Sequence, residues 1–113
     1  MVRSKEYYYR WGGLKEVKSF SRKNFLKHQI SFFPNGNIKE VINYRKGIKH
    51  GEYLNYYKNS NIREISEYLY GQRNNLSLFY NHKGELIKSI EYDENRILSE
   101  SYFIKENLNK RIE

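Results

Sequence analysis

The chain has 113 residues, of which 30% are charged and 17% aromatic, with a formal net charge of +8 and no cysteine. This length suits one domain, and the aromatic content predicts a folded chain, because disordered chains lack such side chains. Membrane-spanning proteins are excluded because no apolar run is long enough, and disulfide scaffolds, cysteine-ligated zinc and thiol catalysis are excluded because cysteine is absent. The first residues show no apolar signal segment, so we expect a cytoplasmic protein.

Positive charge is concentrated in the first half of the chain. Residues 1–50 hold twelve Lys and Arg against three acids, whereas residues 51–113 hold nine against ten. A field of one sign recruits nucleic acid, an anionic membrane or an acidic protein surface. The asymmetry therefore predicts the charge of a partner and says little about the fold.

A period of 24 residues runs through the chain. It is carried by an apolar, an aromatic and a glutamate column: Leu14, Ile38, Ile62 and Leu86; Phe20, Tyr44, Tyr68 and Tyr92; Glu16, Glu40 and Glu64. Such self-similarity is the signature of a repeat architecture. We expect repeats at about residues 7–30, 31–54, 55–78 and 79–103.

Each repeat is predicted to be a β-hairpin. Residues 7–9 open the chain as a strand, and residues 30–33, 53–57 and 76–80 are aromatic strands that enter turns at 34–37, 58–61 and 82–84. The Asn35-Gly36 pair favours a type I′ turn because both residues tolerate positive φ. Each outgoing strand then runs from the apolar to the aromatic column, and loops at 22–24, 45–47, 70–72 and 94–96 lead to the next hairpin.

The end of the chain has a different pattern. Ile104, Leu108 and Ile112 fall at i, i+4 and i+8, which is helical spacing. Repeat arrays need atypical ends that cover a strand edge, so residues 104–113 are predicted to form a short capping helix. The predicted fold is mainly β: one domain over residues 1–113, built as an elongated, twisted antiparallel sheet of about four 24-residue hairpins.

Part of the repeat pattern resembles a known family. The run Phe32-Phe33-Pro34-Asn35-Gly36-Asn37-Ile38, followed by Tyr44, Gly47, Gly51, Tyr56 and Tyr57, is similar to the MORN-variant repeat of bacterial proteins, including YwqK-type antitoxins. The resemblance covers residues 7–103 and implies a β-hairpin array used for protein binding. Ser60 and Asn95 replace a turn and a loop glycine of the pattern, and the glycine- and tryptophan-rich spacing of lipid-binding eukaryotic relatives is absent.

Catalytic and metal-binding patterns are not found. His28, His50 and His82 have no metal-ligand spacing, and surface histidines explain them better. The glutamate column could be taken for paired carboxylates, but the repeat period accounts for it. No nucleophile elbow or phosphate loop is present. We therefore expect no enzyme, no cofactor and no metal.

The basic residues provide the candidate site. If the repeats stack in register, one edge of the sheet gathers loop cations and a further basic row follows the outgoing strands; the predicted partner-binding residues are Arg22, Lys23, Lys27, Arg45, Lys46, Lys49, Lys15 and Lys39. The alternative is a merely solvated surface. Tyrosines among these cations could stack on nucleic-acid bases, although their regular recurrence favours packing.

Three functions follow as hypotheses. The first is a bacterial or phage protein-binding module that neutralises a partner, either as an antitoxin or as a phage inhibitor of a defence nuclease such as an anti-CRISPR. The second is direct binding of RNA or DNA by the basic half, which predicts steep salt dependence. The third is binding to an anionic membrane surface, for which no basic amphipathic helix is evident.

Overall fold

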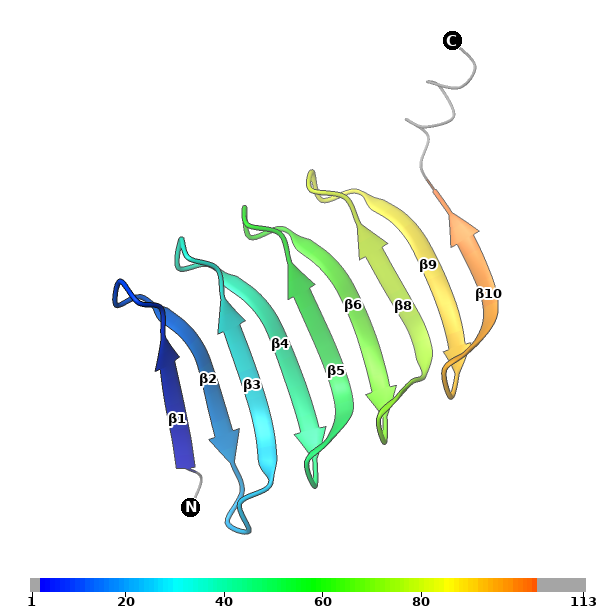
Figure 1. The fold of residues 1–113 in the computed structure, drawn as a ribbon. Helices are drawn as coiled ribbons and strands as arrows, with labels where there is room; N and C mark the ends of the chain where they lie inside the picture. Colours follow the sequence, from blue (N-terminus) through cyan, green and yellow to red (C-terminus); the bar gives the residue numbers. More distant parts are fainter. Residues whose placement is uncertain (1–2, 104–113) are drawn as a thin grey trace.

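The computed structural model describes residues 3–103 as one open antiparallel sheet (Figure 1). Its ten strands are β1 (Arg3–Tyr8), β2 (Leu14–Phe20), β3 (Leu26–Phe32), β4 (Ile38–Arg45), β5 (Ile48–Tyr56), β6 (Ile62–Leu69), β7 (Gln72–Arg73), β8 (Asn75–Tyr80), β9 (Leu86–Asp93) and β10 (Arg96–Tyr102). The strands follow chain order across the sheet, with short β7 pairing beside β6. The prediction of a mainly β, antiparallel sheet is confirmed, while the predicted capping helix at 104–113 lies outside the described residues.

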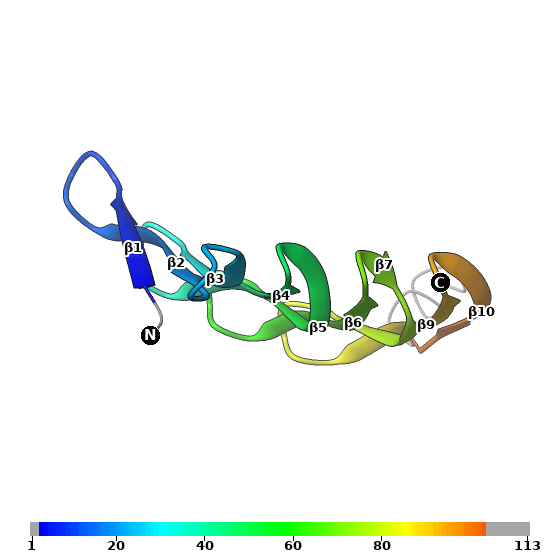
Figure 2. The ribbon, with the colours of Figure 1, turned by 90° about the horizontal axis from the view of Figure 1, so that it is seen from below.

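The described residues form a single layer. The principal extents are 56 × 37 × 17 Å, and the view turned by 90° shows one layer of strands with no second sheet over it (Figure 2). Strands β1 and β10 form the two outer edges of the sheet, and each pairs with one neighbour. Residues 3–103 therefore form an elongated ribbon with no second layer of the same residues on either face.

Three-residue turns of one form line one margin of the sheet, the margin at which the chain turns from β1 into β2. In each turn, the N–H of the residue before the three-residue loop donates to the carbonyl of the residue after it, as from Phe33 to Asn37 at 2.8 Å. The third loop residue has positive φ in all four turns: Gly12, Gly36, Ser60 and Gly84. These positions are 24 residues apart, so the sequence period recurs as turn geometry. We call this margin the amide edge.

The type I′ prediction for Asn35-Gly36 is wrong. Only Gly36 has positive φ, at +91°, and its N–H donates to the Phe33 carbonyl at 2.9 Å, which closes a type I turn. The physical reason is the length of the loop: three residues separate Phe33 from Asn37, and a three-residue hairpin loop adopts a type I turn followed by one left-handed residue. Asn35 therefore takes the third position of the turn, and the left-handed conformation falls to Gly36 alone, as it does to the equivalent residue of the three turns that lack proline.

Asparagine side chains tie neighbouring turns of this edge together. Asn35 and Asn37 both donate to the Lys58 carbonyl, at 3.1 and 2.8 Å. One period later, Asn59 and Asn61 both donate to the carbonyl of His82, at 2.9 and 2.8 Å. The spacing between turns is therefore fixed by side chains as well as by the strand ladder.

Replacing Ser60 with glycine is expected to raise the free energy of unfolding. Ser60 has φ +77°, a conformation that costs an L residue about 1–2 kcal/mol. Glycine removes this strain, but part of the gain is lost because glycine makes the unfolded chain more flexible. We expect a net gain of about 0.5–1 kcal/mol in urea unfolding. The matched reverse change, Gly36→Ser, should lower stability by a similar amount, because a Cβ there meets nothing within 4 Å and only the backbone is strained. A stability loss in Ser60→Gly would contradict this assignment.

The opposite margin, which we call the basic edge, has tighter turns. Three of them have a two-residue loop, both residues of which have positive φ, and the residues on either side of the loop pair directly across the strands. This geometry defines the type I′ turn, and the loops are Lys46-Gly47, Tyr70-Gly71 and Glu94-Asn95. The first turn of this edge, residues 21–25, is one residue longer and has only Asn24 at positive φ. The predicted loops at 22–24, 45–47, 70–72 and 94–96 are thus confirmed as turns on one margin.

The most buried side chains form one row across the middle of one face. Ile42 pairs with Tyr53, Tyr53 with Ser66, and Ser77 with Ile90; Ser66 and Ser77 are joined by a hydroxyl hydrogen bond of 2.6 Å. Paired residues point to the same side of a sheet. We call this side the polar face, because Glu16, Glu40 and Glu64 lie in its adjacent row. The core therefore lies beneath the long polar side chains of this face.

Candidate interaction site at the basic edge

Two neighbouring turns of the basic edge carry exposed cations. Arg22 and Lys23 lie in the turn between β2 and β3, and Arg45 and Lys46 in the turn between β4 and β5 (Figure 1). None of the four forms an ion pair with another residue of 3–103. Lys27, also exposed, lies at the start of β3 and lines a shallow hollow together with Arg45 and Lys46. The structure thus brings five of the predicted binding residues together.

Packing between turns explains why these cations lie side by side. A Cβ on Gly47 would lie 3.7 Å from the Phe25 ring, and a Cβ on Gly71 would lie 3.2 Å from Ile48, so neighbouring turns pack against each other. The Gly71 N–H also donates to the Lys49 carbonyl at 2.7 Å, and the Asn95 N–H to the Arg73 carbonyl at 2.8 Å. The turns of this edge form a contiguous and braced margin.

The positive charge fades along this margin toward β10. The third turn presents Tyr70 and Gly71, and the fourth presents Glu94 and Asn95. Arg96, the remaining cation near the fourth turn, is paired with Asp93 at 2.7 Å. Among residues 3–103, the unpaired positive charge of this edge therefore lies in the half toward β1, up to β5.

Three predicted site residues lie elsewhere. Lys49 is on β5 with its ammonium 5.2 Å from the centre of the Tyr68 ring and 5.7 Å from that of Tyr53, so it packs on the polar face. Lys15 and Lys39 follow turns of the amide edge, at the far ends of β2 and β4. They lie over the rings of Tyr9 and Phe33 at 5.8 and 5.9 Å. These three lysines do not join the cluster on the basic edge.

Sequence reasoning missed several residues of the edge. Arg3, the first residue of β1, lies at this margin. Its guanidinium is 5.6 Å from the Phe20 ring centre and donates to the Asn24 side chain. Phe25, Ile48 and Tyr70 are exposed by 44%, 49% and 59% among the turns. An apolar residue directly beside a turn is the sequence signal that could have marked them. The edge therefore combines cations with apolar contact surface.

The glutamate column does not form a carboxylate pair. Glu16, Glu40 and Glu64 are separated by intervening strands, and each has its own partner: Lys18 at 3.7 Å, the Tyr53 hydroxyl at 2.5 Å and the Arg73 guanidinium at 2.6 Å, respectively. Strands about 4.8 Å apart place successive carboxylates roughly 10 Å from one another. The column stabilises the polar face by local pairing.

Arg73 is the centre of the tightest polar network. It donates to Glu64 at 2.6 Å and to the Ser66 hydroxyl at 3.0 Å, while Ser66 also donates to Glu64 at 2.6 Å. Its guanidinium lies 5.4 and 5.7 Å from the ring centres of Tyr68 and Tyr92. Burial lowers the pKa of Arg73, but the hydrogen bond and charge of Glu64 outweigh burial and leave that pKa raised.

Stability is expected to fall in alkali through Tyr53. Burial, then the hydrogen bond to Glu40 and its charge, raise the pKa of Tyr53 well above the ordinary value of 10. The unfolded chain ionises this phenol first, so stability is full below about pH 10 and falls above it. Between about pH 8 and pH 11, wild type should lose more unfolding free energy than Tyr53→Phe in urea titrations. Equal losses in the two proteins would contradict this role of Tyr53.

The histidines take part in structural contacts. His28 Nδ1 lies 2.7 Å from the Asn43 side-chain oxygen, and His50 Nδ1 accepts the Tyr70 N–H at 3.1 Å. Among residues 3–103, no three His, Asp or Glu side chains gather as metal ligands would. The same part of the chain contains no helix with the length and apolarity needed to cross a bilayer.

Comparison with known proteins gives no relative. Neither protein-family models, nor curated proteins, nor solved structures match the chain significantly. The function must therefore be argued from the geometry of the sheet and its margins.

Proposed function

We propose that this chain is a non-enzymatic protein-binding module whose basic edge engages an acidic surface of a partner and neutralises it. The observation that carries the proposal is the position of four exposed cations on two adjacent turns, none of which forms an ion pair with a residue of 3–103: Arg22, Lys23, Arg45 and Lys46. Complementary charge speeds encounter and selects the partner, and the neighbouring Phe25 and Ile48 supply apolar contact area.

An inhibitor of this type needs only shape and charge. Blocking a nucleic-acid channel, or covering a toxin, requires no reacting group. We accordingly propose a bacterial or phage protein acting in the cytoplasm, either an antitoxin or an inhibitor of a defence nuclease such as an anti-CRISPR. The recurring turns support a division into four 24-residue hairpins at residues 7–30, 31–54, 55–78 and 79–103. Membership of the MORN-variant repeat proteins and a capping helix at residues 104–113 remain part of the proposal.

Partner capture tests this function. The tagged protein is immobilised and exposed to nuclease-treated lysate of its bacterial host, and bound proteins are identified by mass spectrometry. We expect one saturable partner with an acidic or nucleic-acid-binding surface, released as salt rises because exposed charges are screened. Absence of any saturable partner would contradict the proposal.

Direct binding of nucleic acid is the second candidate, favoured by Tyr70 and Phe25 exposed on the same margin as the cations. Aromatic rings beside Lys and Arg hold single strands by stacking and charge. The test titrates a labelled single-stranded oligonucleotide at several salt concentrations. Each neutralised phosphate should contribute about 0.7 to the slope of log K against log salt. A flat or absent response excludes this function.

Binding to an anionic membrane is a lesser candidate. The same cluster would contribute about 1 kcal/mol for each basic residue near the lipid surface. Co-sedimentation with vesicles containing phosphatidylserine is the measurement, and recovery of the protein in the supernatant excludes this role.

A further inference from the structure

The second side of the sheet carries a continuous apolar band. Its central row consists of directly paired residues on six strands: Val17, Ile30, Val41, Leu54, Ile65 and Leu78. Two residues further along β3, β5 and β8 come Phe32, Tyr56 and Tyr80, paired with Ile38, Ile62 and Leu86. Alternation along a strand puts both rows on one side, which we call the apolar face.

Nothing within residues 3–103 covers this face. The five most buried side chains all lie in the central row of the polar face, whereas every residue of the apolar central row keeps partial exposure. Ile38 and Leu86 are 38% and 36% exposed. A sheet with one apolar side is normally packed against a second layer, so this face lacks its layer.

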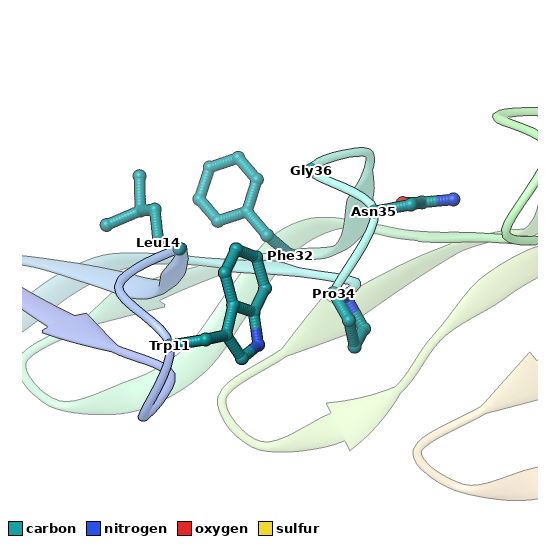
Figure 3. Close-up of a pocket in the computed structure, with 7 residues that line it drawn as sticks. Trp11, Leu14, Phe32, Pro34, Asn35 and Gly36 are labelled. Atoms are coloured by element: carbon teal, nitrogen blue, oxygen red, sulfur yellow. The ribbon is translucent and has the colours of Figure 1, made fainter.

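The band is continued at the amide edge by an open apolar hollow. Leu14 and Phe32 point to the same side there, and Trp11, 64% exposed, lies beside Phe32 and Pro34 (Figure 3). Trp11 stacks on Tyr9 with ring centres 5.7 Å apart, and its indole occupies the space that a Cβ on Gly13 would need. The apolar surface thus reaches the margin of the sheet.

Opposite charges border the band on its two sides. Toward the amide edge, a cationic rim stands two residues before Val17, Val41 and Ile65 and consists of Lys15, Lys39 and Arg63. Toward the basic edge, an acidic rim consists of Glu52, Glu67 and Glu91, which flank the same central row. The face is therefore apolar in the middle, positive at β2, β4 and β6 along one side and negative at β5, β6 and β9 along the other.

Two carboxylates of the acidic rim need a cation that residues 3–103 do not supply. Glu52 and Glu67 are directly paired across β5 and β6 and both are exposed. Like charges at such a position are destabilising. Glu67 accepts a hydrogen bond from Asn75, but no Lys or Arg of the described chain forms an ion pair with either carboxylate. A facing cationic rim would supply the missing charge.

We infer that a second copy of this chain covers the apolar face, with the strands of the two copies antiparallel. A two-fold axis in the interface, perpendicular to the strands, places each strand over its own counterpart. The cations Lys39 and Arg63 of each copy then lie near Glu52 and Glu67 of the other. An axis parallel to the strands would bring like rims together. The two sheets would stack about 10 Å apart, as in a β-sandwich.

The size of the face suits this assembly. A stable interface requires about 800 Å² from each partner, and a sheet with extents of 56 × 37 Å offers more than twice that area. The contact is isologous, because one self-complementary face serves both copies. The dimer carries its two basic edges on opposite margins, free for the partner proposed above.

Rim-swapped variants of the full chain test the proposal by sedimentation velocity in about 0.15 M salt, where the repulsion between net charges is screened. Wild type should be dimeric at about 100 μM, a concentration above the micromolar-to-picomolar dissociation constants found for interfaces of about 1,600 Å² in total. Lys39→Glu with Arg63→Glu makes the cationic rim acidic except at Lys15, and Glu52→Lys with Glu67→Lys makes the acidic rim basic except at Glu91. Each double variant alone should dissociate at least tenfold more readily, since both rim contacts become repulsive.

An equimolar mixture of the two double variants should dimerise as wild type does, because every rim then meets its opposite. The chain with all four changes should recover a homodimer. Leu54→Lys, in the centre of the band, should be monomeric, with its fold checked by far-UV circular dichroism. A monomeric wild type, failure of the mixture to associate, or dimers that persist in Leu54→Lys would each overturn the proposal.

Discussion

Replacing Arg73 with methionine is expected to lower the free energy of unfolding by about 2–3 kcal/mol. The change leaves the Glu64 carboxylate, 13% exposed, without the guanidinium that lies 2.6 Å away. It also removes a donor from Ser66 and the cation between the Tyr68 and Tyr92 rings. The cost stays below that of a fully buried pair because Arg73 retains 26% exposure. Urea unfolding measures it directly.

The chain offers a matched control for this change. Arg96 also pairs with a carboxylate, Asp93, at 2.7 Å, but the two side chains are 74% and 47% exposed. Exposed pairs contribute little, so Arg96→Met should cost no more than about 0.5 kcal/mol. Adding Glu64→Gln to Arg73→Met should restore part of the loss, because no unpaired charge then remains. Similar costs at positions 73 and 96 would contradict the structural role given to Arg73.

Reversing the charge of Arg22, Lys23, Arg45 and Lys46 together should abolish partner binding, with a loss of at least about 100-fold in affinity. All four side chains are exposed in turns, so the free energy of unfolding should change by less than about 1 kcal/mol. Lys49 is left unchanged, because it packs between Tyr53 and Tyr68 and its reversal would disturb the polar face. Binding is measured by calorimetry against the captured partner, and retained affinity would contradict a role for the edge.

Much of the fold could be predicted from the sequence, because the 24-residue period repeats both turn signals and strand alternation. The turn residues at 36, 60 and 84 and the loops after 45 and 70 are found where the period puts them. The type of the Asn35-Gly36 turn was missed because the turn type depends on loop length, and the three-residue loop between Phe33 and Asn37 follows from the strand register. The capping helix stays a prediction, since residues 104–113 are not described.

The candidate site could be predicted only in part. Arg22, Lys23, Arg45 and Lys46 follow from turn positions, whereas Lys49 could not be placed without knowing which tyrosine rings lie beside it. The sequence was sufficient to place Lys15 and Lys39 away from the basic edge. Each follows a turn of the amide edge, and the strand that begins there separates it from the turns of the opposite margin. The facing rims of the apolar face needed the strand register, which brings Glu52 opposite Glu67.

Comparison of two charge-reversed pairs on opposite margins tests the central claim most directly. Lys23→Glu with Lys46→Glu alters turns of the basic edge, and Arg10→Glu with Lys58→Glu alters exposed turn residues of the amide edge, with the same change in net charge. If the basic edge is the binding site, the first pair should weaken partner binding at least about tenfold more than the second. Equal effects of the two pairs would show that only net charge matters and would contradict a localised site.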